Sequence, residues 1–177
     1  MKRSILVFLL SALLLTGCAD RPAAPQGSET QTAAAESEAA RPMVSMYDLR
    51  LAMLAAQPDL PEMRSVSSSD DNAAGLFAYL SDLDYEKVEG YFLSYAADGK
   101  SANEFAVVCL KDAADAPALE ASLRNHVKGR VDLYKTYGPE QVEQASAAEL
   151  VTLGRYVALI MCADRAAVQA AFRAGVQ

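Results

Sequence analysis

The chain has 177 residues, and its 16 Lys and Arg against 23 Asp and Glu give a formal net charge of −7 at pH 7. This length fits one ordinary domain and excludes a large multidomain enzyme, while 52% hydrophobic residues exclude a wholly disordered chain. The acidic balance opposes contact with phosphate backbones, so we expect no nucleic-acid partner.

The first residues have the organisation of an export signal. Lys2 and Arg3 precede an apolar run from Ile5 to Leu15, which is too short to span a bilayer but fits the hydrophobic segment of a signal peptide. The next residues complete the sequence LTGC, ending at Cys18, which resembles the lipobox of bacterial lipoproteins. In a lipobox the thiol receives a diacylglycerol group and the chain is cut just before the cysteine.

We therefore predict a signal peptide at residues 1–17 and lipid attachment at Cys18. The partner of the anchor would be the membrane, and the location the extracytoplasmic face of the cell membrane. An ordinary signal peptide, with Cys18 later in a disulfide, is the alternative. Residues 19–42 contain no aliphatic residue larger than Ala and no aromatic residue, so we predict a disordered linker at 18–42 and one globular domain at 43–177.

The first half of the domain predicts helices followed by two strands. Ser45 is a suitable N-cap for a helix that ends before Pro58, and residues 67–70 offer N-caps for a second helix. A short turn is expected at 84–88. The aromatic-rich segment 91–95 and the apolar segment 104–111, with Asp98-Gly99 between them, predict paired strands.

The second half repeats this order of helices, then strands, and adds a last helix. Pro117 suits the first turn of a helix whose apolar positions recur about every four residues up to Tyr134. Gly138-Pro139 ends it and begins another helix that reaches about Ala148. Segments 150–153 and 156–162 predict a hairpin, and Asp164 is a suitable cap for the final helix. We predict an α+β fold with a small antiparallel sheet of about four strands and helices packed on one face; the strand order stays open.

Three segments of the domain resemble a family of bacterial surface lipoproteins that carry a domain of unknown function. They are YKTYGPEQVE at 134–143, GRYVALI at 154–160 and LPEM at 60–63. The resemblance implies an anchored extracytoplasmic domain without an established activity. Cysteines at 109 and 162 stand where aliphatic residues would be more usual in strands.

Cys109 and Cys162 are the only thiols besides Cys18. They could form a disulfide if their strands were neighbours with Cα atoms about 4.4–6.8 Å apart, or they could remain as two core thiols. His126 is the only histidine, and the chain has no C-x-x-C or H-E-x-x-H motif. We therefore predict no metal, no cofactor and no catalytic residues, and we interpret His126 as a partly covered residue on a helix face.

Carboxylates and tyrosines gather in one part of the chain. Asp82, Asp84 and Glu86 alternate as at the start of a calcium loop, but the later positions do not match an EF-hand. Four tyrosines accompany Phe92, and they could line a groove for sugars or peptides or simply form core; they are Tyr79, Tyr85, Tyr91 and Tyr95.

These features predict a monomeric binding or interaction module of the cell envelope, with an unknown envelope ligand or protein as partner and no enzyme activity. The main alternative is an envelope-acting hydrolase that uses carboxylates. A third hypothesis is a structural or regulatory lipoprotein that contacts another protein through a sheet edge or helix face.

Overall fold

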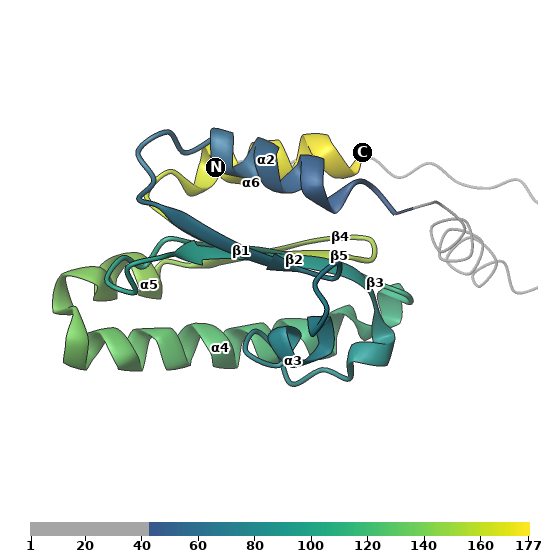
Figure 1. Cartoon of the computed structure of the whole chain (residues 1–177), viewed down its shortest axis with the longest axis horizontal. Coiled ribbons are helices and arrows are strands. Elements are labelled where there is room, and N and C mark those ends of the chain that lie inside the picture. The colour runs from purple at the N-terminus through teal and green to yellow at the C-terminus, as the bar shows by residue number, and fades with distance from the viewer. Residues whose placement is uncertain (1–42) are drawn as a thin grey trace, which may run out of the picture.

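The computed structural model describes residues 43–177 (Figure 1). The predicted signal peptide at 1–17, the lipid attachment at Cys18 and the predicted linker at 18–42 lie outside the described residues. The strands are β1 Met63–Ser67, β2 Val88–Ala96, β3 Glu104–Leu110, β4 Glu149–Leu153 and β5 Tyr156–Met161. The α-helices are α2 Met46–Ala55, α3 Ala73–Phe77, α4 Ala116–Tyr137, α5 Val142–Ser146 and α6 Arg165–Val176. Short 3-10 turns are η1 Tyr85–Lys87, η2 Ala113–Asp115 and η3 Pro139–Gln141.

The fold is α+β, as predicted, but the described sheet has five strands instead of about four. Their order is β1-β2-β3-β5-β4, and every neighbouring pair is antiparallel. The missed strand is β1, which lies at the edge of the sheet. Its sequence MRSVS is short and largely polar, and its residues are only partly buried or exposed, so it lacks the apolar run that marks the central strands.

The helix predicted after residues 67–70 begins later and is shorter than expected. Ser67 still belongs to β1, and its backbone N–H donates to Asp70 Oδ2 at 2.6 Å. These residues therefore form the turn that leaves the strand, and α3 starts only at Ala73. Two predicted caps are confirmed: Ser45 Oγ accepts from the Asp48 N–H, and Asp164 Oδ1 accepts from the Ala167 N–H.

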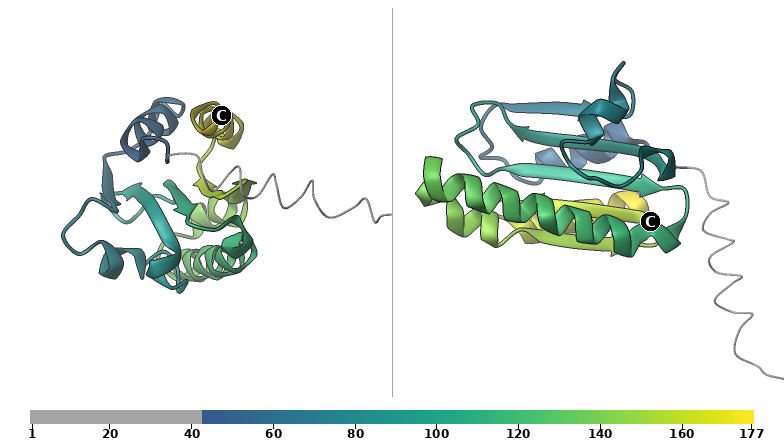
Figure 2. Two further views of the ribbon diagram at one scale, coloured as in Figure 1. Left: turned by 90° about the vertical axis from the view of Figure 1, so that its right-hand side faces the viewer. Right: turned by 90° about the horizontal axis from the view of Figure 1, so that it is seen from below.

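Helices cover both faces of the sheet, so the expectation of helices on one face was wrong. Figures 1 and 2 show α2 and α6 side by side on one face, and α3, α4 and α5 on the other. Side chains alternate across each strand, so Phe92 and Phe105 pack towards α2 and α6 while Tyr91 and Leu93 pack towards α3 and α4. This arrangement explains why β2 carries aromatic residues for both faces.

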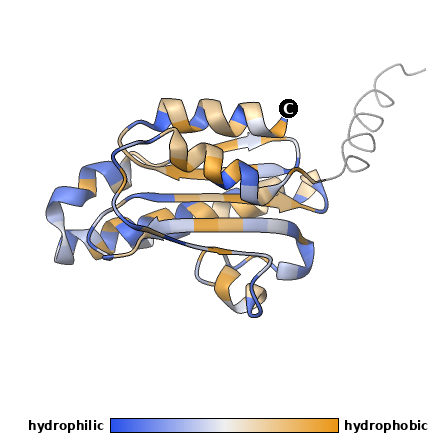
Figure 3. Ribbon diagram, turned by 45° about the horizontal axis from the view of Figure 1, so that its top comes forward, coloured by the Kyte–Doolittle hydropathy of each residue, from blue (hydrophilic) through white to orange (hydrophobic). Residues whose placement is uncertain are grey.

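The central strands are buried on both sides. Every residue of β3 and of β5 is buried, and Figure 3 shows hydrophobic segments in the strands that lie between the two helical layers. No helix among residues 43–177 is long and apolar enough to cross a membrane.

Candidate functional site

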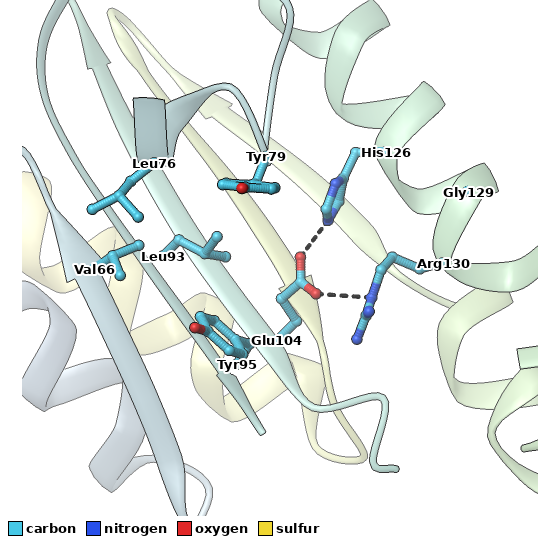
Figure 4. Close-up of a pocket in the computed structure, with 9 residues that line it drawn as sticks. All are labelled: Val66, Leu76, Tyr79, Leu93, Tyr95, Glu104, His126, Gly129 and Arg130. Carbon is cyan, nitrogen blue, oxygen red and sulfur yellow. Dashed lines mark hydrogen bonds and ion pairs between the residues drawn. The ribbon is translucent and has the colours of Figure 1, made fainter. Parts of the chain in front are cut away.

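A cavity of about 530 Å³ opens on the sheet face that carries α3 and α4. It lies between these helices, with β1 and β2 as its floor and the start of β3 at one side. Figure 4 shows its lining residues, which are Val66, Leu76, Tyr79, Leu93, Tyr95, Glu104, His126, Gly129 and Arg130. We call this space the α3–α4 cavity. Its volume is within the range of pockets that hold small molecules.

One side of the α3–α4 cavity is formed by three charged or titratable side chains. Glu104, the first residue of β3, is 3% exposed. His126 Nε2 lies 2.5 Å from its Oε1, and Arg130 Nε lies 3.1 Å from its Oε2 (Figure 4). His126 and Arg130 are four residues apart on α4, which places them on the same helix face. The buried carboxylate therefore has a partner for each oxygen, as burial of a charge requires.

The opposite side of the cavity is apolar. Val66 and Leu93 are directly opposed across β1 and β2, and Leu76 reaches them from α3. Tyr79 follows α3 and is 78% exposed, so it forms part of the rim. Tyr95 is opposed to Glu104 across β2 and β3 and therefore shares its sheet face. The cavity thus joins an apolar surface to a charged cluster within one space.

A glycine keeps part of this space open. Gly129 lies on α4 between His126 and Arg130, and a Cβ built there would have no other atom within 4 Å. Glycine in a helix interior lowers stability by roughly 0.5–1 kcal/mol relative to alanine. No close contact at this position requires glycine, and its effect is to leave the space between His126 and Arg130 on α4 without a further side chain.

Arg130 is held in place by the residue one turn further along α4. Its Nη2 donates to Tyr134 Oη at 2.8 Å, and the Tyr134 hydroxyl donates to the Ser101 carbonyl at 2.7 Å. The guanidinium carbon also lies 5.1 Å from the centre of the Tyr134 ring. Burial raises the pKa of Tyr134, and the nearby Arg130 charge opposes that shift. The phenol therefore keeps its proton at neutral pH and can donate.

The segments that follow α4 fix the loop that leads into Glu104. Gln141 Oε1 accepts from the Ala102 N–H at 2.9 Å, and Gln144 Nε2 donates to Asn103 Oδ1 at 3.3 Å. Together with Tyr134, these contacts hold residues 101–103 directly before Glu104. The segment YKTYGPEQVE therefore contributes two of the groups that position the carboxylate of the cavity.

The structure places Cys109 and Cys162 too far apart to form a disulfide. Cys109 is opposed to Tyr156 across β3 and β5, whereas Cys162 lies just beyond Met161, which is opposed to Glu104. Their strands are neighbours, as a disulfide would require, but six residues along a strand correspond to about 20 Å. Both are free, buried thiols, so the disulfide left open above does not form in this structure. Burial raises the pKa of Cys162 to about 11 and also raises that of Cys109.

The aromatic and acidic residues singled out from the sequence are divided between core and cavity. Phe77, Tyr85 and Tyr91 pack together with ring centroids 5.2–6.0 Å apart, while Tyr79 and Tyr95 line the cavity. Asp84 Oδ1 accepts from the Glu86 N–H and thereby caps η1. Among residues 43–177, no group of three or more His, Cys, Asp or Glu side chains is arranged to hold a metal ion.

The prediction for His126 was confirmed for its place but missed its companions. Its side chain is 15% exposed on α4, and it contacts Glu104, which also pairs with Arg130. The sequence does indicate that Glu104 needs a partner. It is the only charged residue in the apolar strand EFAVVCL, and a carboxylate in a buried strand needs a cationic partner. The identity of that partner was not visible, since it comes from another element.

The chain matches the family model of a domain of unknown function, DUF4358, over residues 64–162. The match includes every residue that lines the α3–α4 cavity, whereas α2 and α6 lie outside it. No curated protein and no solved structure matches the chain. Since the family model covers more than half of the sequence, the chain belongs to the DUF4358 family.

Proposed function

We propose that this chain is a lipoprotein of the bacterial cell envelope, anchored through Cys18 on the extracytoplasmic face of the membrane. The proposal is supported by the basic start, the short apolar run and the LTGC sequence at residues 15–18. An anchor with two or more acyl chains holds a protein on a membrane stably, because each buried CH₂ contributes about 0.8 kcal/mol.

The anchor is tested by fractionation and intact mass. Cys18→Ser should move the protein from the membrane fraction to the soluble fraction, and the wild-type mass should show removal of residues 1–17 and addition of lipid. Cys162→Ala serves as the matched control and should remain with the membrane. Full retention of the Cys18→Ser protein on the membrane would reject the anchor.

The domain itself is proposed to bind a small molecule that has an apolar body and one polar group. The observation that carries this function is the α3–α4 cavity, in which Val66 and Leu93 face the Glu104, His126 and Arg130 cluster. Ligand sites commonly combine an apolar lining with a few polar groups that orient the ligand. The body would lie against the floor of the cavity and the polar group beside α4.

The lining residues support a binding role better than they support the alternative role of a hydrolase that uses carboxylates. A glycosidase of the common kind needs two carboxyl groups roughly 5–9.5 Å apart. Glu104 is the single carboxylate among the residues that line the cavity, and each of its oxygens is already paired, one with His126 and one with Arg130. The lining residues also include no Ser, Thr, Cys or Lys that could act as a nucleophile.

Gly129→Leu tests whether the cavity is the binding site. We would purify the full chain in phospholipid nanodiscs and titrate it with 4-phenylbutyrate and with its neutral amide, 4-phenylbutanamide. Because His126 is the only histidine, a ¹³C label at its Cε1 gives one resonance that reports on the cavity. The wild-type resonance should shift on addition of at least one of the two compounds, and Gly129→Leu should weaken that binding by occupying the part of the cavity beside His126 and Arg130.

Lys128→Leu is the matched control. It places the same leucine on α4 at a position whose side chain is 77% exposed, so binding should be unchanged. The thermal midpoint of Gly129→Leu should not fall, because leucine is a better helix former than glycine. Failure of both compounds to bind the wild type, or unchanged binding by Gly129→Leu, would reject the cavity as the ligand site.

A further inference from the structure

The charged side of the α3–α4 cavity has more hydrogen-bonding capacity than its one carboxylate uses. Arg130 is cationic at every relevant pH. His126 Nε2 shares a hydrogen bond with Glu104 Oε1. The formal charge of Glu104 is thus balanced by Arg130 alone, and His126 adds further hydrogen-bonding capacity beside it.

Arg130 has donors that the described part of the protein does not satisfy. A guanidinium has five N–H groups, and one of them, at Nη2, donates to Tyr134. The buried Nε lies 3.1 Å from Glu104 Oε2 but forms no hydrogen bond with it. An additional acceptor at this place would therefore meet unused donors on a side chain that Tyr134 already holds in position.

The surroundings favour an anion over a cation. Each oxygen of Glu104 already has a partner, the guanidinium of Arg130 or the imidazole of His126, so little of its charge is left to attract a positive group. The other lining residues are apolar, apart from the hydroxyls of Tyr79 and Tyr95. A cationic ligand would be repelled by the charge of Arg130. An anionic ligand would be repelled only by Glu104, whose charge is partly neutralised.

We propose that the ligand of the α3–α4 cavity is a small monocarboxylate with a hydrocarbon body, whose carboxylate binds to Arg130 and His126. This inference rests on the proposed binding function and adds the charge of the ligand to it. Arg130 offers a planar set of donors that matches a carboxylate. The hydrocarbon body lies against Val66, Leu76 and Leu93.

The experiment compares three compounds that separate body from charge. The acid 4-phenylbutyrate has both, 4-phenylbutanamide has the body alone, and acetate has the charge alone. Each is titrated at pH 6.5 into the full chain in phospholipid nanodiscs, with the His126 resonance and calorimetry as readouts. We expect 4-phenylbutyrate to bind at least about tenfold more tightly than the amide, because charge-assisted hydrogen bonds are stronger than neutral ones. We expect acetate, which lacks the hydrocarbon body, to bind weakly.

Two substitutions should change the affinity for the acid in opposite directions. Arg130→Met removes the main donor and should weaken binding of 4-phenylbutyrate at least about tenfold, with a small effect on the amide. Glu104→Gln keeps the shape but removes the competing negative charge, so it should strengthen binding of the acid. Damage to the fold would weaken binding in both variants and for both compounds, so it cannot imitate this pattern.

Arg124→Met is the matched control for Arg130→Met. Arg124 also lies on α4, pairs with Glu120 and has a side chain that is 65% exposed, so its loss should leave all three affinities unchanged. Equal affinity of acid and amide would overturn the carboxylate inference while leaving the proposed binding function in place. Loss of acid binding by Glu104→Gln would also overturn it, and absence of binding by both aromatic compounds would reject both proposals.

Discussion

The two faces of the sheet are built from the same strands but packed differently. On the face covered by α2 and α6, large side chains such as Met53, Phe105 and Phe172 are 0% exposed and form a closed core. On the other face, α4 covers only part of the sheet and the α3–α4 cavity lies beside it. Glu104 and Phe105 are adjacent in β3, yet one faces the cavity and the other the closed core.

Under the proposed binding function, this difference separates the part of the domain that is closed from the part that would hold the ligand. The closed face buries large side chains, which is the dominant favourable contribution to folding. The open face leaves apolar surface beside a buried charged cluster, and it lies within the residues matched by the DUF4358 family model, whereas α2 and α6 do not. The comparison teaches that α2 and α6 complete one closed core, while the opposite face combines a second core under α3 and α4 with a cavity.

Leucine truncation on the two faces gives the largest expected contrast. Leu49→Ala on α2 removes a side chain that is 2% exposed in the closed core, and should lower the free energy of unfolding by about 2–5 kcal/mol. Leu76→Ala on α3 removes a partly buried side chain that already borders a cavity, so about 1 kcal/mol is expected. Urea denaturation measures both values, and equal losses would show that the faces are equally packed.

Alkaline pH should affect buried groups on both faces, and Cys162 and Tyr91 have the largest shifts. Burial raises the pKa of Cys162, on the closed face, from 9.0 to about 11, and that of Tyr91, on the cavity face, from 10.0 to about 12. Because both folded pKa values lie above the unfolded ones, the stabilisation is complete below the unfolded pKa. It is lost as pH rises, between about 9 and 11 for the thiol and between about 10 and 12 for the phenol, and is on the order of 2 kcal/mol each.

Urea denaturation at a series of pH values checks this prediction. Cys162→Ala should reduce the loss of stability that begins near pH 9, to which Cys109 also contributes. Tyr91→Phe should reduce the loss that begins near pH 10, to which Tyr134 and Tyr156 also contribute. A wild-type free energy of unfolding that stays constant from pH 9 to 12 would contradict the assignment of both groups.

Two helical glycines give the smallest contrast, but with opposite signs. Gly129→Ala on α4 adds a methyl group into open space and should raise the free energy of unfolding by about 0.5–1 kcal/mol. Gly175→Ala on α6 places a Cβ 2.5 Å from Leu49 Cδ1 in the closed core, and should lower it by about 1 kcal/mol. Differential scanning calorimetry compares the two, and a stabilising Gly175→Ala would show that α2 and α6 can separate without cost.

Patterns along the chain were sufficient for the elements with strong local signals. The caps at Ser45 and Asp164, the apolar stripe of α4 and the β4–β5 hairpin could be predicted, because each depends on residues close together in sequence. The edge strand β1 was missed because pairing with β2, and not its own composition, makes it a strand. The second helical layer was missed because apolar residues on alternate sides of β2 do not tell which helices cover them.

The candidate site depended on contacts between distant parts of the chain. Glu104 and His126 are separated by 22 residues, and Gln144 and Asn103 by 41. The antiparallel order and register of β2 and β3 put Tyr95 opposite Glu104, and the register of β3 and β5 keeps Cys109 away from Cys162. A motif search finds none of these neighbours, since no fixed spacing connects them.

Local chemistry along the chain was thus enough to decide which segments become helices and strands, and to predict an export signal before them. Packing decided which side chains meet: it surrounded Glu104 with His126 and Arg130 and left a cavity beside Gly129. The reason is physical. Helix caps and turns act between neighbours in sequence, whereas burial of a charge is favourable only when folding brings partners from other elements to it.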